Sequence, residues 1–237
     1  MTLLQPTDPI EIMKQKAALR ALERVRDGMK LGLGTGSTAR YFVDGLGQKV
    51  AEGLDVVCVP TSEVTRVQAE SLNIPMAELG DLRRLDLTVD GADEITQELY
   101  LIKGGGGALL REKIVAAASD AMIVIADDTK LVTQLGAYAL PVEVNKFAHG
   151  ATAAVLRQVF ETQDLSGPIS LRGGDTPFET DGGHFIYDCA LENIAAPHAL
   201  AAELLNVPGV VEHGLFLTYA TAAVLAGADS LREYGAL

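Results

Sequence analysis

Apolar residues recur at two different spacings in the first half of the chain. Over Pro9–Arg26 they stand three or four positions apart with Lys and Arg between them, which predicts an amphipathic helix. Further along, short segments rich in apolar residues predict strands at Met29–Gly34, Leu54–Pro60 and Leu85–Asp90, and the continuous apolar run Ala121–Ala126 predicts a buried strand.

Helical segments separate these runs. Their spacing and start signals predict helices at Ser37–Leu46, Thr61–Leu72 and Leu109–Ala118. A chain that alternates strand and helix in this way builds a parallel sheet with helices on both faces. The sequence therefore predicts a Rossmann-like, doubly wound and mostly parallel α/β sheet.

The pattern changes after Gly136. Strand, helix, strand, strand and helix follow at Leu140–Val144, Ala151–Phe160, Ile169–Leu171, Phe185–Cys189 and Pro197–Leu205. This order predicts a smaller α+β domain of the ferredoxin-like kind, inserted into the first domain.

We expect two domains from this change of pattern. Residues 1–135 and 208–237 would form the Rossmann-like catalytic domain, and residues 136–207 would form the smaller domain and take part in oligomer contacts. Gly209–Thr218 and the alanine-rich Tyr219–Gly227 are expected to return to the main sheet.

Composition narrows the classes of partner. The 237 residues carry a net charge of −13, and no basic stripe appears, which argues against nucleic acid. No apolar stretch approaches the length of a membrane span, and the first twenty residues mix charges of both signs, unlike a signal peptide. Cys58 and Cys189 lie in apolar runs and indicate buried thiols in a reducing compartment. We expect a cytoplasmic protein.

Polar segments follow the expected strands where ligands bind in such folds. The glycine turn at 34–36, Thr61-Ser62, Asp90–Asp93 and Asp127–Lys130 all stand at strand C-termini. Because ligands of doubly wound sheets bind beyond that edge, we expect these segments to converge.

The glycine turn Gly32–Thr38 follows a strand and opens a helix. Ser37 stands where a dinucleotide-binding fingerprint has its third glycine, so a nucleotide is disfavoured. The hydroxyls of Thr35, Ser37 and Thr38, with Gly36 and the amides of a helix N-terminus, suit a single phosphate better. A plain tight turn is the alternative.

Four consecutive glycines follow Lys103. Glycines contribute no side chain, so their use at Gly104, Gly105 and Gly106 is close approach of backbone N–H groups to a ligand. With Glu112 downstream, this indicates an anionic substrate and proton-transfer chemistry. The alternatives are a solvated loop lysine and a helix-surface glutamate.

Asp90 and Asp93 stand three residues apart at a strand end, with Gly91 and Ala92 between them. They fit a Mg²⁺ site, a pair of acid–base carboxylates or an ordinary turn. A metal would need further ligands, and the sequence holds no HxH, HExxH or Asp-x-Asp-x-Asp motif, so we expect no metal and no other cofactor. The four histidines are too scattered to define a site.

Taken together, six segments resemble type A ribose-5-phosphate isomerases. They are Gly32–Thr38, Asp90–Ile95, Lys103–Gly106, Arg111–Ile114, Leu140–Val144 and Pro208–Val211. The resemblance implies a metal-free aldose–ketose isomerase that interconverts D-ribose 5-phosphate and D-ribulose 5-phosphate through an enediolate, in the non-oxidative pentose phosphate pathway. It also implies a homodimer or homotetramer.

The resemblance assigns roles to individual residues. Glu112 matches the general base that moves a proton between C1 and C2, and Lys103 matches the cation beside the enediolate. Asp90 and Asp93 match paired acids, the former for ring opening. The matched substrate-binding residues are Thr35, Gly36, Ser37, Thr38, Gly91, Ala92, Gly104, Gly105, Gly106 and, on the phosphate side, Lys130.

The chemistry fits these residues independently of the resemblance. Isomerising a 2-hydroxyaldehyde phosphate needs a base, a donor to the carbonyl oxygen and a grip on phosphate. Glu112 supplies the first if burial raises its pKa. The sequence departs from the family pattern at Leu110, where threonine is common, and at His184, where asparagine is frequent.

Two other functions remain open from the sequence. Coenzyme A transferases and amino-sugar phosphate isomerases or deaminases have similar architecture, and the former use a glutamate as a covalent nucleophile. A sugar-phosphate sensor is the non-enzyme alternative, although no helix-turn-helix or basic segment accompanies the motifs.

Overall fold

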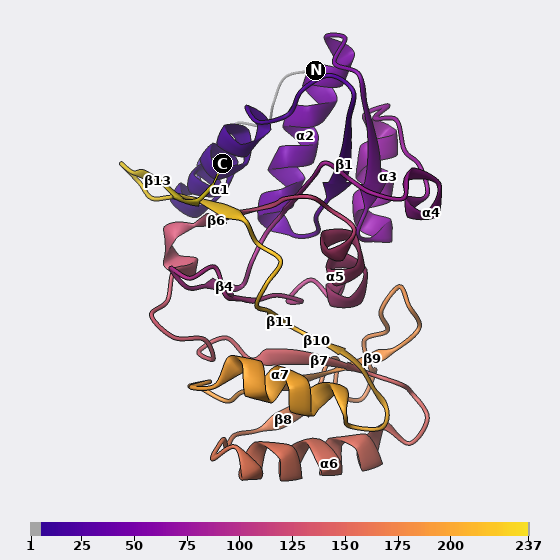
Figure 1. The fold of residues 1–237 in the computed structure, drawn as a ribbon, viewed down its shortest axis with the longest axis vertical. Coiled ribbons are helices and arrows are strands. Elements are labelled where there is room, and N and C mark those ends of the chain that lie inside the picture. Colours follow the sequence, from indigo (N-terminus) through magenta and orange to yellow (C-terminus); the bar gives the residue numbers. More distant parts are fainter. Residues whose placement is uncertain (1–5, 237) are drawn as a thin grey trace. The chain divides into compact units, whose positions relative to one another are not determined.

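The computed structural model describes residues 6–236, and a six-stranded sheet forms the centre of its first part (Figure 1). Its strands are β1 (Met29–Leu33), β2 (Val56–Pro60), β3 (Leu87–Asp90), β6 (Met122–Asp127), β12 (Ala222–Ala226) and β13 (Leu231–Gly235). They lie in the order β13-β12-β6-β3-β1-β2, and every neighbouring pair is parallel except β12 and β13. The expected doubly wound, mostly parallel sheet is confirmed.

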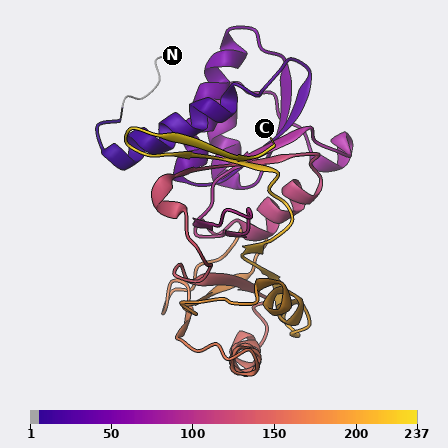
Figure 2. The same ribbon diagram turned by 60° about the vertical axis from the view of Figure 1, so that its left-hand side comes forward.

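Helices cover both faces of this sheet (Figures 1 and 2). Helices α1 (Pro9–Leu22) and α2 (Ser37–Ala51) pack on the face to which Leu31 and Leu33 point. A Cβ at Gly32, between them, would lie on the opposite face and meet Val115 of α5 (Leu109–Ala117). The short helices α3 (Glu63–Ser71) and α4 (Leu79–Leu82) complete this part of the fold. Burial on both faces explains why β2, β6 and β12 carry apolar residues without alternation over most of their length.

Helix α1 is shorter than its apolar pattern suggests. Asp8 caps it by accepting hydrogen bonds from the N–H groups of Ile10 and Glu11, and Pro9 occupies the first turn. The helix ends at Leu22, not at Arg26. The chain then turns through Gly28, whose φ of +80° suits glycine, to enter β1.

The order of the strands reverses between β1 and β3. Strand β2 lies on one side of β1, whereas β3, β6 and β12 follow on the other. Such a switch point opens a crevice beyond the strand C-termini, which is where open α/β sheets bind ligands. The turns after β1 and β3, at 34–36 and 91–92, flank this point.

A four-stranded antiparallel sheet and two helices form the second part of the molecule. Strands β7 (Leu140–Val144), β8 (Ile169–Leu171), β9 (Phe185–Cys189) and β10 (Val210–His213) lie in the order β10-β7-β9-β8. Helices α6 (His149–Thr162) and α7 (Pro197–Leu205) connect β7 to β8 and β9 to β10. This βαββαβ arrangement is the ferredoxin-like fold that the sequence predicts.

Strand β10 corrects one expectation from the sequence. Val210–His213 does not return to the main sheet but pairs with β7 and supplies the fourth strand of the small one. The βαββα unit would otherwise leave an edge of β7 unpaired, which explains the placement. Only β12, within the alanine-rich stretch, joins the main sheet as expected.

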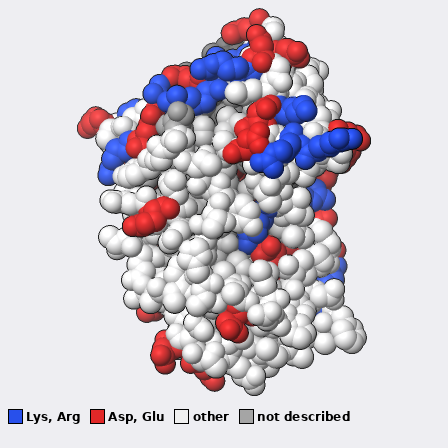
Figure 3. Space-filling model, in the orientation of Figure 1, with Lys and Arg blue, Asp and Glu red and all other residues white. Residues whose placement is uncertain are grey.

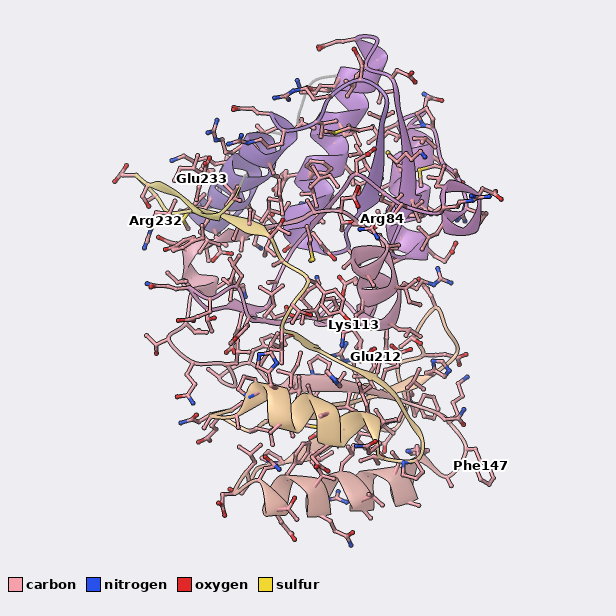
Figure 4. All side chains as sticks on the ribbon, in the orientation of Figure 1. Arg84, Lys113, Phe147, Glu212, Arg232 and Glu233 are labelled. Carbon is pink, nitrogen blue, oxygen red and sulfur yellow. The ribbon has the colours of Figure 1, made fainter. Side chains whose placement is uncertain are left out.

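Apart from the 3₁₀ turn Asp128–Lys130, five elements were not predicted as separate helices or strands. Three are two-residue strands, β4 (Glu94–Ile95), β5 (Leu101–Ile102) and β11 (Leu215–Phe216), which form a small sheet in the order β11-β5-β4. The others are α4 and β13. Strand β13 is polar, and Arg232 and Glu233 extend from it (Figure 4). Glu233 accepts a hydrogen bond of 2.6 Å from Arg20 of α1.

The contacts within the chain divide it into two units. The first unit holds the chain up to Ala92, Arg111–Leu131 and the chain from Thr218 on, and the second holds Asp93–Leu110 and Val132–Leu217. From the sequence, we expected the domain boundaries at 135/136 and 207/208, with residues 93–110 in the first domain. That segment belongs with the second unit because β5 pairs with β11 and the loop after it bonds to Arg172.

In Figure 3, side chains of both charges gather side by side in the upper part of the face drawn, whereas most of the rest of that face is uncharged. On α3, Arg66 pairs with Glu63 and Glu70, and Arg111 of α5 also pairs with Glu63. Among residues 6–236, no helix has the length and hydropathy needed to cross a membrane.

Candidate active site

The turn after β1 is fitted tightly against β3. The N–H of Gly34 donates to the carbonyl of Val89 at 2.9 Å, and a Cβ at Gly34 would lie 2.1 Å from Oδ1 of Asp90. The N–H of Thr35 donates to the same Oδ1 at 3.0 Å. Glycine is therefore required at 34 for Asp90 and this turn to meet.

Helix α2 starts from this turn without a side-chain cap. Its N-cap is Gly36, with φ of +124°, and Ser37 is exposed in the first turn whereas Thr38 is buried. The first amides of a helix lack intrahelical acceptors and favour anions. The structure thus gives the expected phosphate-binding turn a suitable backbone.

The hydroxyl of Thr35 lies in a cluster of hydroxyl groups. Its Oγ1 is 2.7 Å from Oγ1 of Thr61, 2.8 Å from Oγ of Ser62 and 3.2 Å from Oγ1 of Thr65. Thr65 in turn donates to the carbonyl of Gly34 at 3.0 Å. The side chain of Thr35 therefore ties the first turn to the segment after β2. Thr61 and Ser62 were flagged by their place at a strand end, whereas Thr65 carried no signal in the sequence.

Asp90 ends β3 and is completely buried. Its Oδ1 accepts from the N–H of Gly91 at 2.7 Å as well as from Thr35. Backbone donors of this kind stabilise a carboxylate and fix its orientation. Ala92, the last residue before the second unit, is half-buried.

Glu112 lies in the first turn of α5 and is only 3% exposed. Its neighbour Lys113 is also buried, whereas Arg111 is partly exposed and pairs with Glu63 at 3.0 Å. The alternative of a helix-surface glutamate is therefore wrong for Glu112, and it is Arg111 that makes the surface pair. Lys113 is a second buried cation that the sequence reading did not single out.

Lys130 occupies the end of a 3₁₀ turn, Asp128–Lys130, directly after β6. Asp127 caps this turn by accepting from the N–H of Thr129 at 3.2 Å. Since β6 runs parallel to β3, Lys130 follows the strand edge at which Asp90 stands. Its side chain is half-buried.

The remaining predicted residues belong to the second unit. Asp93 donates its N–H to the carbonyl of Ile102 at 2.9 Å, and its Oδ2 accepts from the N–H of Gly105 at 2.8 Å. Gly104 and Gly107 have φ of +106° and +81°, and the N–H of Gly107 closes the loop onto the carbonyl of Gly104 at 2.9 Å. Asp93 thus holds the glycine loop by its backbone.

Lys103 precedes this loop and is 2% exposed. Its N–H donates to the carbonyl of Gly214 at 2.9 Å, and its Nζ lies 5.5 Å from the centroid of the Phe216 ring. The alternative of a solvated loop lysine is therefore wrong. A buried ammonium at a glycine loop is a fixed positive charge, which suits a developing anion.

Tyr138 adds a polar group that the sequence did not indicate. A Cβ at Gly105 would lie 2.5 Å from its hydroxyl and 2.5 Å from Oδ1 of Asp93. Burial, with the negative charge of Asp93, raises the pKa of Tyr138. Buried Glu94 fixes the segment before it by accepting from the N–H groups of Gly136 and Tyr138.

His184, the departure from the usual asparagine, faces a buried carboxylate. Its Nδ1 lies 2.9 Å from Oε1 of Glu143, which also accepts from the hydroxyl of Thr180 at 2.8 Å. Glu143 is 1% exposed and stands in the middle of β7. His184 and Thr180 thus both contact one buried carboxylate oxygen.

A hollow of about 650 Å³ lies in the first unit among β2, α3, α4 and α5. Arg66, Glu63 and Arg111 line it beside apolar residues such as Met76 and Ile114. None of the predicted site residues lines it. In the described part of the chain, no group of three or more His, Cys, Asp or Glu is arranged to hold a metal ion.

Comparison with known proteins gives a consistent result. The family model for ribose 5-phosphate isomerase A, also called phosphoriboisomerase A, matches residues 57–230. A ribose-5-phosphate isomerase A of Bradyrhizobium diazoefficiens is 57% identical over 226 residues, which are 93% of this chain and 94% of that protein. A Rhodopseudomonas palustris relative of the same name is 58% identical over 224 residues, 94% of this chain and 97% of that protein.

Solved structures agree over the whole fold. The ribose 5-phosphate isomerase of Plasmodium falciparum has a TM-score of 0.90 at 34% identity and covers 96% of this chain and 99% of its own. A D-ribose-5-phosphate isomerase in complex with phospho-erythronic acid has a TM-score of 0.89 at 36% identity, with 96% and 99% coverage. The resemblance inferred from motifs therefore extends to a similar fold over 96% of the chain.

Proposed function

This chain belongs to the ribose 5-phosphate isomerase A family, and on that premise we propose that it interconverts D-ribose 5-phosphate and D-ribulose 5-phosphate. The observation that carries the proposal is the burial of Glu112 and Lys103 within a sequence that matches the family along almost its full length. Burying charged groups costs free energy, and chemistry is a reason to retain them.

We propose that Glu112 is the base for the proton transfer. In the open-chain aldose, a base removes the proton from C2, and the electrons of that bond form the double bond of an enediolate between C1 and C2. The electron pair of the C1 carbonyl moves to O1 in this step. The hydroxyl proton of O2 then passes to O1, the proton taken from C2 returns to C1, and the carbonyl forms at C2, which gives the ketose. A carboxylate held in the first turn of a helix is rigid enough for such transfer.

Lys103 and the loop Gly104–Gly106 would stabilise the enediolate. Negative charge develops on the substrate oxygens as the proton leaves C2, and a fixed ammonium with backbone N–H donors stabilises that charge in the transition state. The burial of Lys103 beside the ring of Phe216 supports this role, because a buried side chain has few orientations open to it.

Asp90 and Asp93 would serve as the acid groups of the site. We assign ring opening of the cyclic sugar to Asp90, which backbone donors from Thr35 and Gly91 hold in place. Asp93 supports the glycine loop through the N–H of Gly105. The two carboxylates thus differ in their surroundings, which is how paired acids take different roles.

The phosphate group would be bound by the turn after β1. The uncapped start of α2, the hydroxyls of Ser37 and Thr38, and Lys130 after β6 support this assignment. Gly91 and Ala92 would contribute substrate contacts through the backbone. The relative that binds phospho-erythronic acid carries a compound with phosphate and carboxylate groups, which fits such a site.

Isotope exchange tests the proposal directly. The protein is incubated with ribose 5-phosphate in deuterated water, and the substrate and product are analysed by NMR. Deuterium at the reacting carbon with formation of ribulose 5-phosphate is the expected result. Neither exchange nor ketose formation would favour a sensor, and a trapped glutamyl thioester with coenzyme A would favour a transferase.

We further infer that the protein works as a homodimer or homotetramer in the cytoplasm, without a metal or cofactor. The family resemblance supports the oligomer, and the acidic net charge supports the lack of a nucleic-acid partner. Sedimentation velocity of the purified chain measures its assembly. A purely monomeric species at working concentration would remove the oligomer from the proposal.

A further inference from the structure

Arg172 is held in one orientation at the end of β8. Its Nε donates to Oδ2 of Asp188 at 2.9 Å and its Nη2 to Oδ1 at 2.5 Å, so the guanidinium forms a two-pronged pair with that carboxylate. Its backbone is fixed too, because the N–H bonds to Ile186 and the carbonyl accepts from Phe178. Such a pair orients the planar group with little freedom left.

The remaining nitrogen of Arg172 bonds to the glycine loop. Its Nη1 donates to the carbonyl of Gly104 at 2.9 Å and to that of Gly105 at 3.3 Å. On the other end of the Gly104–Gly105 peptide group, the N–H of Gly105 donates to Asp93. This peptide group is therefore bound at both its oxygen and its nitrogen.

The next peptide group has only its oxygen bound. Peptide bonds in this structure include no cis bond, so the N–H of Gly106 points opposite to the Gly105 carbonyl that Arg172 holds. Gly106 is exposed, whereas Gly104 is buried. Within residues 6–236, the N–H of Gly106 has no hydrogen-bond acceptor. The arginine thus sets the direction of a donor that the protein itself does not use.

We propose that Arg172, oriented by Asp188, is a positioning residue that presents the N–H of Gly106 to an oxygen of the substrate. The inference rests on the isomerase function proposed above. Arginine is needed because one ammonium cannot bind both carboxylate oxygens and also two successive carbonyls. Phe178 closes the loop from the side, since a Cβ at Gly107 would lie 2.5 Å from its ring.

Kinetics of four proteins test the proposal: wild type, Arg172→Ala, Arg172→Lys and Arg157→Ala. Arg157 is exposed on α6 and gives a matched loss of one arginine in the same unit. Loss of one oriented donor costs on the order of 10²-fold in turnover, so we expect such a fall in kcat for Arg172→Ala with a smaller change in KM. Arg172→Lys should also lose turnover, and Arg157→Ala should match wild type.

Two measurements separate positioning from mere stability. Millimolar guanidinium should restore turnover to Arg172→Ala and leave Arg157→Ala unchanged. Amide hydrogen exchange at Gly107, which bonds to Gly104, should speed up in Arg172→Ala. The exchange measurement does not depend on catalytic activity. It therefore tests the contact between Arg172 and the glycine loop even if the wild-type protein does not turn over ribose 5-phosphate. Lack of turnover in the wild type would refute the isomerase function and leave the loop contact untouched.

Opposite outcomes would overturn the proposal. Turnover and Gly107 exchange equal to those of Arg157→Ala would show that Arg172 does not set the loop. A loss of turnover that follows the fall in thermal midpoint and resists guanidinium would reduce Arg172 to a structural role. Should Arg172→Ala not fold, Arg172→Lys and Asp188→Asn decide by the same comparison. Each weakens the pair, and the first keeps a long cationic side chain while the second keeps the size of the side chain.

Discussion

Glu112 and Lys103 are charged side chains that the fold takes out of water. The local sequence favours exposure to solvent for both side chains. Three consecutive charged residues on a helix, as at 111–113, and a lysine beside glycines are usually solvated. Burial depends on what packs against these positions from distant parts of the chain. For that reason the residues were identified from their motifs, and their environment could be learned only from the structure.

Replacing Glu112 tests the proton transfer. Glu112→Gln keeps the size of the side chain but removes the base, so we expect turnover to fall by about 10²–10⁴ with an unchanged thermal midpoint. Steady-state kinetics and thermal unfolding measure the two. Glu70→Gln is the matched control, because Glu70 is an exposed glutamate on α3. Turnover near that of wild type in Glu112→Gln would remove the base from the mechanism.

Lys103 and Lys130 should differ in which kinetic constant they control. Lys103→Met removes the charge and keeps the buried volume, and we expect kcat to fall by about 10²-fold because the contact strengthens as the enediolate forms. Lys130→Ala should mainly raise KM, because the phosphate does not react. The opposite pattern in the two variants would mean that the two lysines have exchanged roles.

The roles of Tyr138 and Arg172 at the glycine loop could not be predicted from the sequence. Each is a single residue outside any motif, tens of positions from Gly104–Gly106 along the chain. These contacts form because the strands and turns of the second unit bring the segments together. No local pattern carries that information, whereas the motifs Asp90–Ile95 and Lys103–Gly106 each lie within a few consecutive residues.

At the scale of elements, the turn between β1 and α2 depends on the absence of a side chain at Gly34. A Cβ there would lie 2.5 Å from the Cα of Asp90, which is backbone and cannot move aside alone. The strands β1 and β3 would have to separate where the site is built. The glycine turn is therefore part of the placement of Asp90.

Gly34→Ala should therefore lose both stability and turnover. Forcing an extra methyl group into a packed site costs about 1–3 kcal/mol, and the displaced Asp90 should lower kcat as well. Differential scanning fluorimetry and kinetics measure the two effects. Gly80→Ala is the control, since a Cβ at that position in α4 meets nothing within 4 Å. Equal behaviour of the two variants would contradict the tight fit.

Element length explains which strands the sequence predicted. Leu140–Val144, Ile169–Leu171 and Phe185–Cys189 were predicted with their observed bounds, because compact apolar runs mark them. The two-residue strands β4, β5 and β11 are too short to show a period. Strand β10 was recognised as extended but assigned to the wrong sheet, because the choice of partner is a tertiary property.

At the scale of the whole molecule, the residues assigned to one reaction come from both units. Asp90, Glu112 and the phosphate-binding turn belong to the first, whereas Asp93, Lys103 and the glycine loop belong to the second. The chain passes between the units at Ala92–Asp93 and Leu110–Arg111, beside these residues. The link between them is the order of the matched family segments along the chain.

Treatment with a chelator tests the metal-free chemistry at this scale. We expect the protein to keep full turnover after exhaustive EDTA treatment and dialysis, because Glu112 and Lys103 supply the base and the cation that the reaction needs. Turnover before and after treatment, with and without added Mg²⁺ or Zn²⁺, is the measurement. A loss that a metal restores would reopen Asp90 and Asp93 as ligands.

The two cysteines are buried in the fold, and their burial affects the reactivity of the thiols as well as the packing. Burial raises the pKa of Cys58 to about 12 and raises that of Cys189 also. Oxidants and alkylating agents attack the thiolate, and at neutral pH almost none is present. Peroxide or iodoacetamide should therefore leave turnover unchanged while the protein stays folded, which an activity assay with mass spectrometry can follow. Sugar-phosphate interconversion by this protein would then continue through oxidative stress, and reducing agents can be omitted when it is purified or stored.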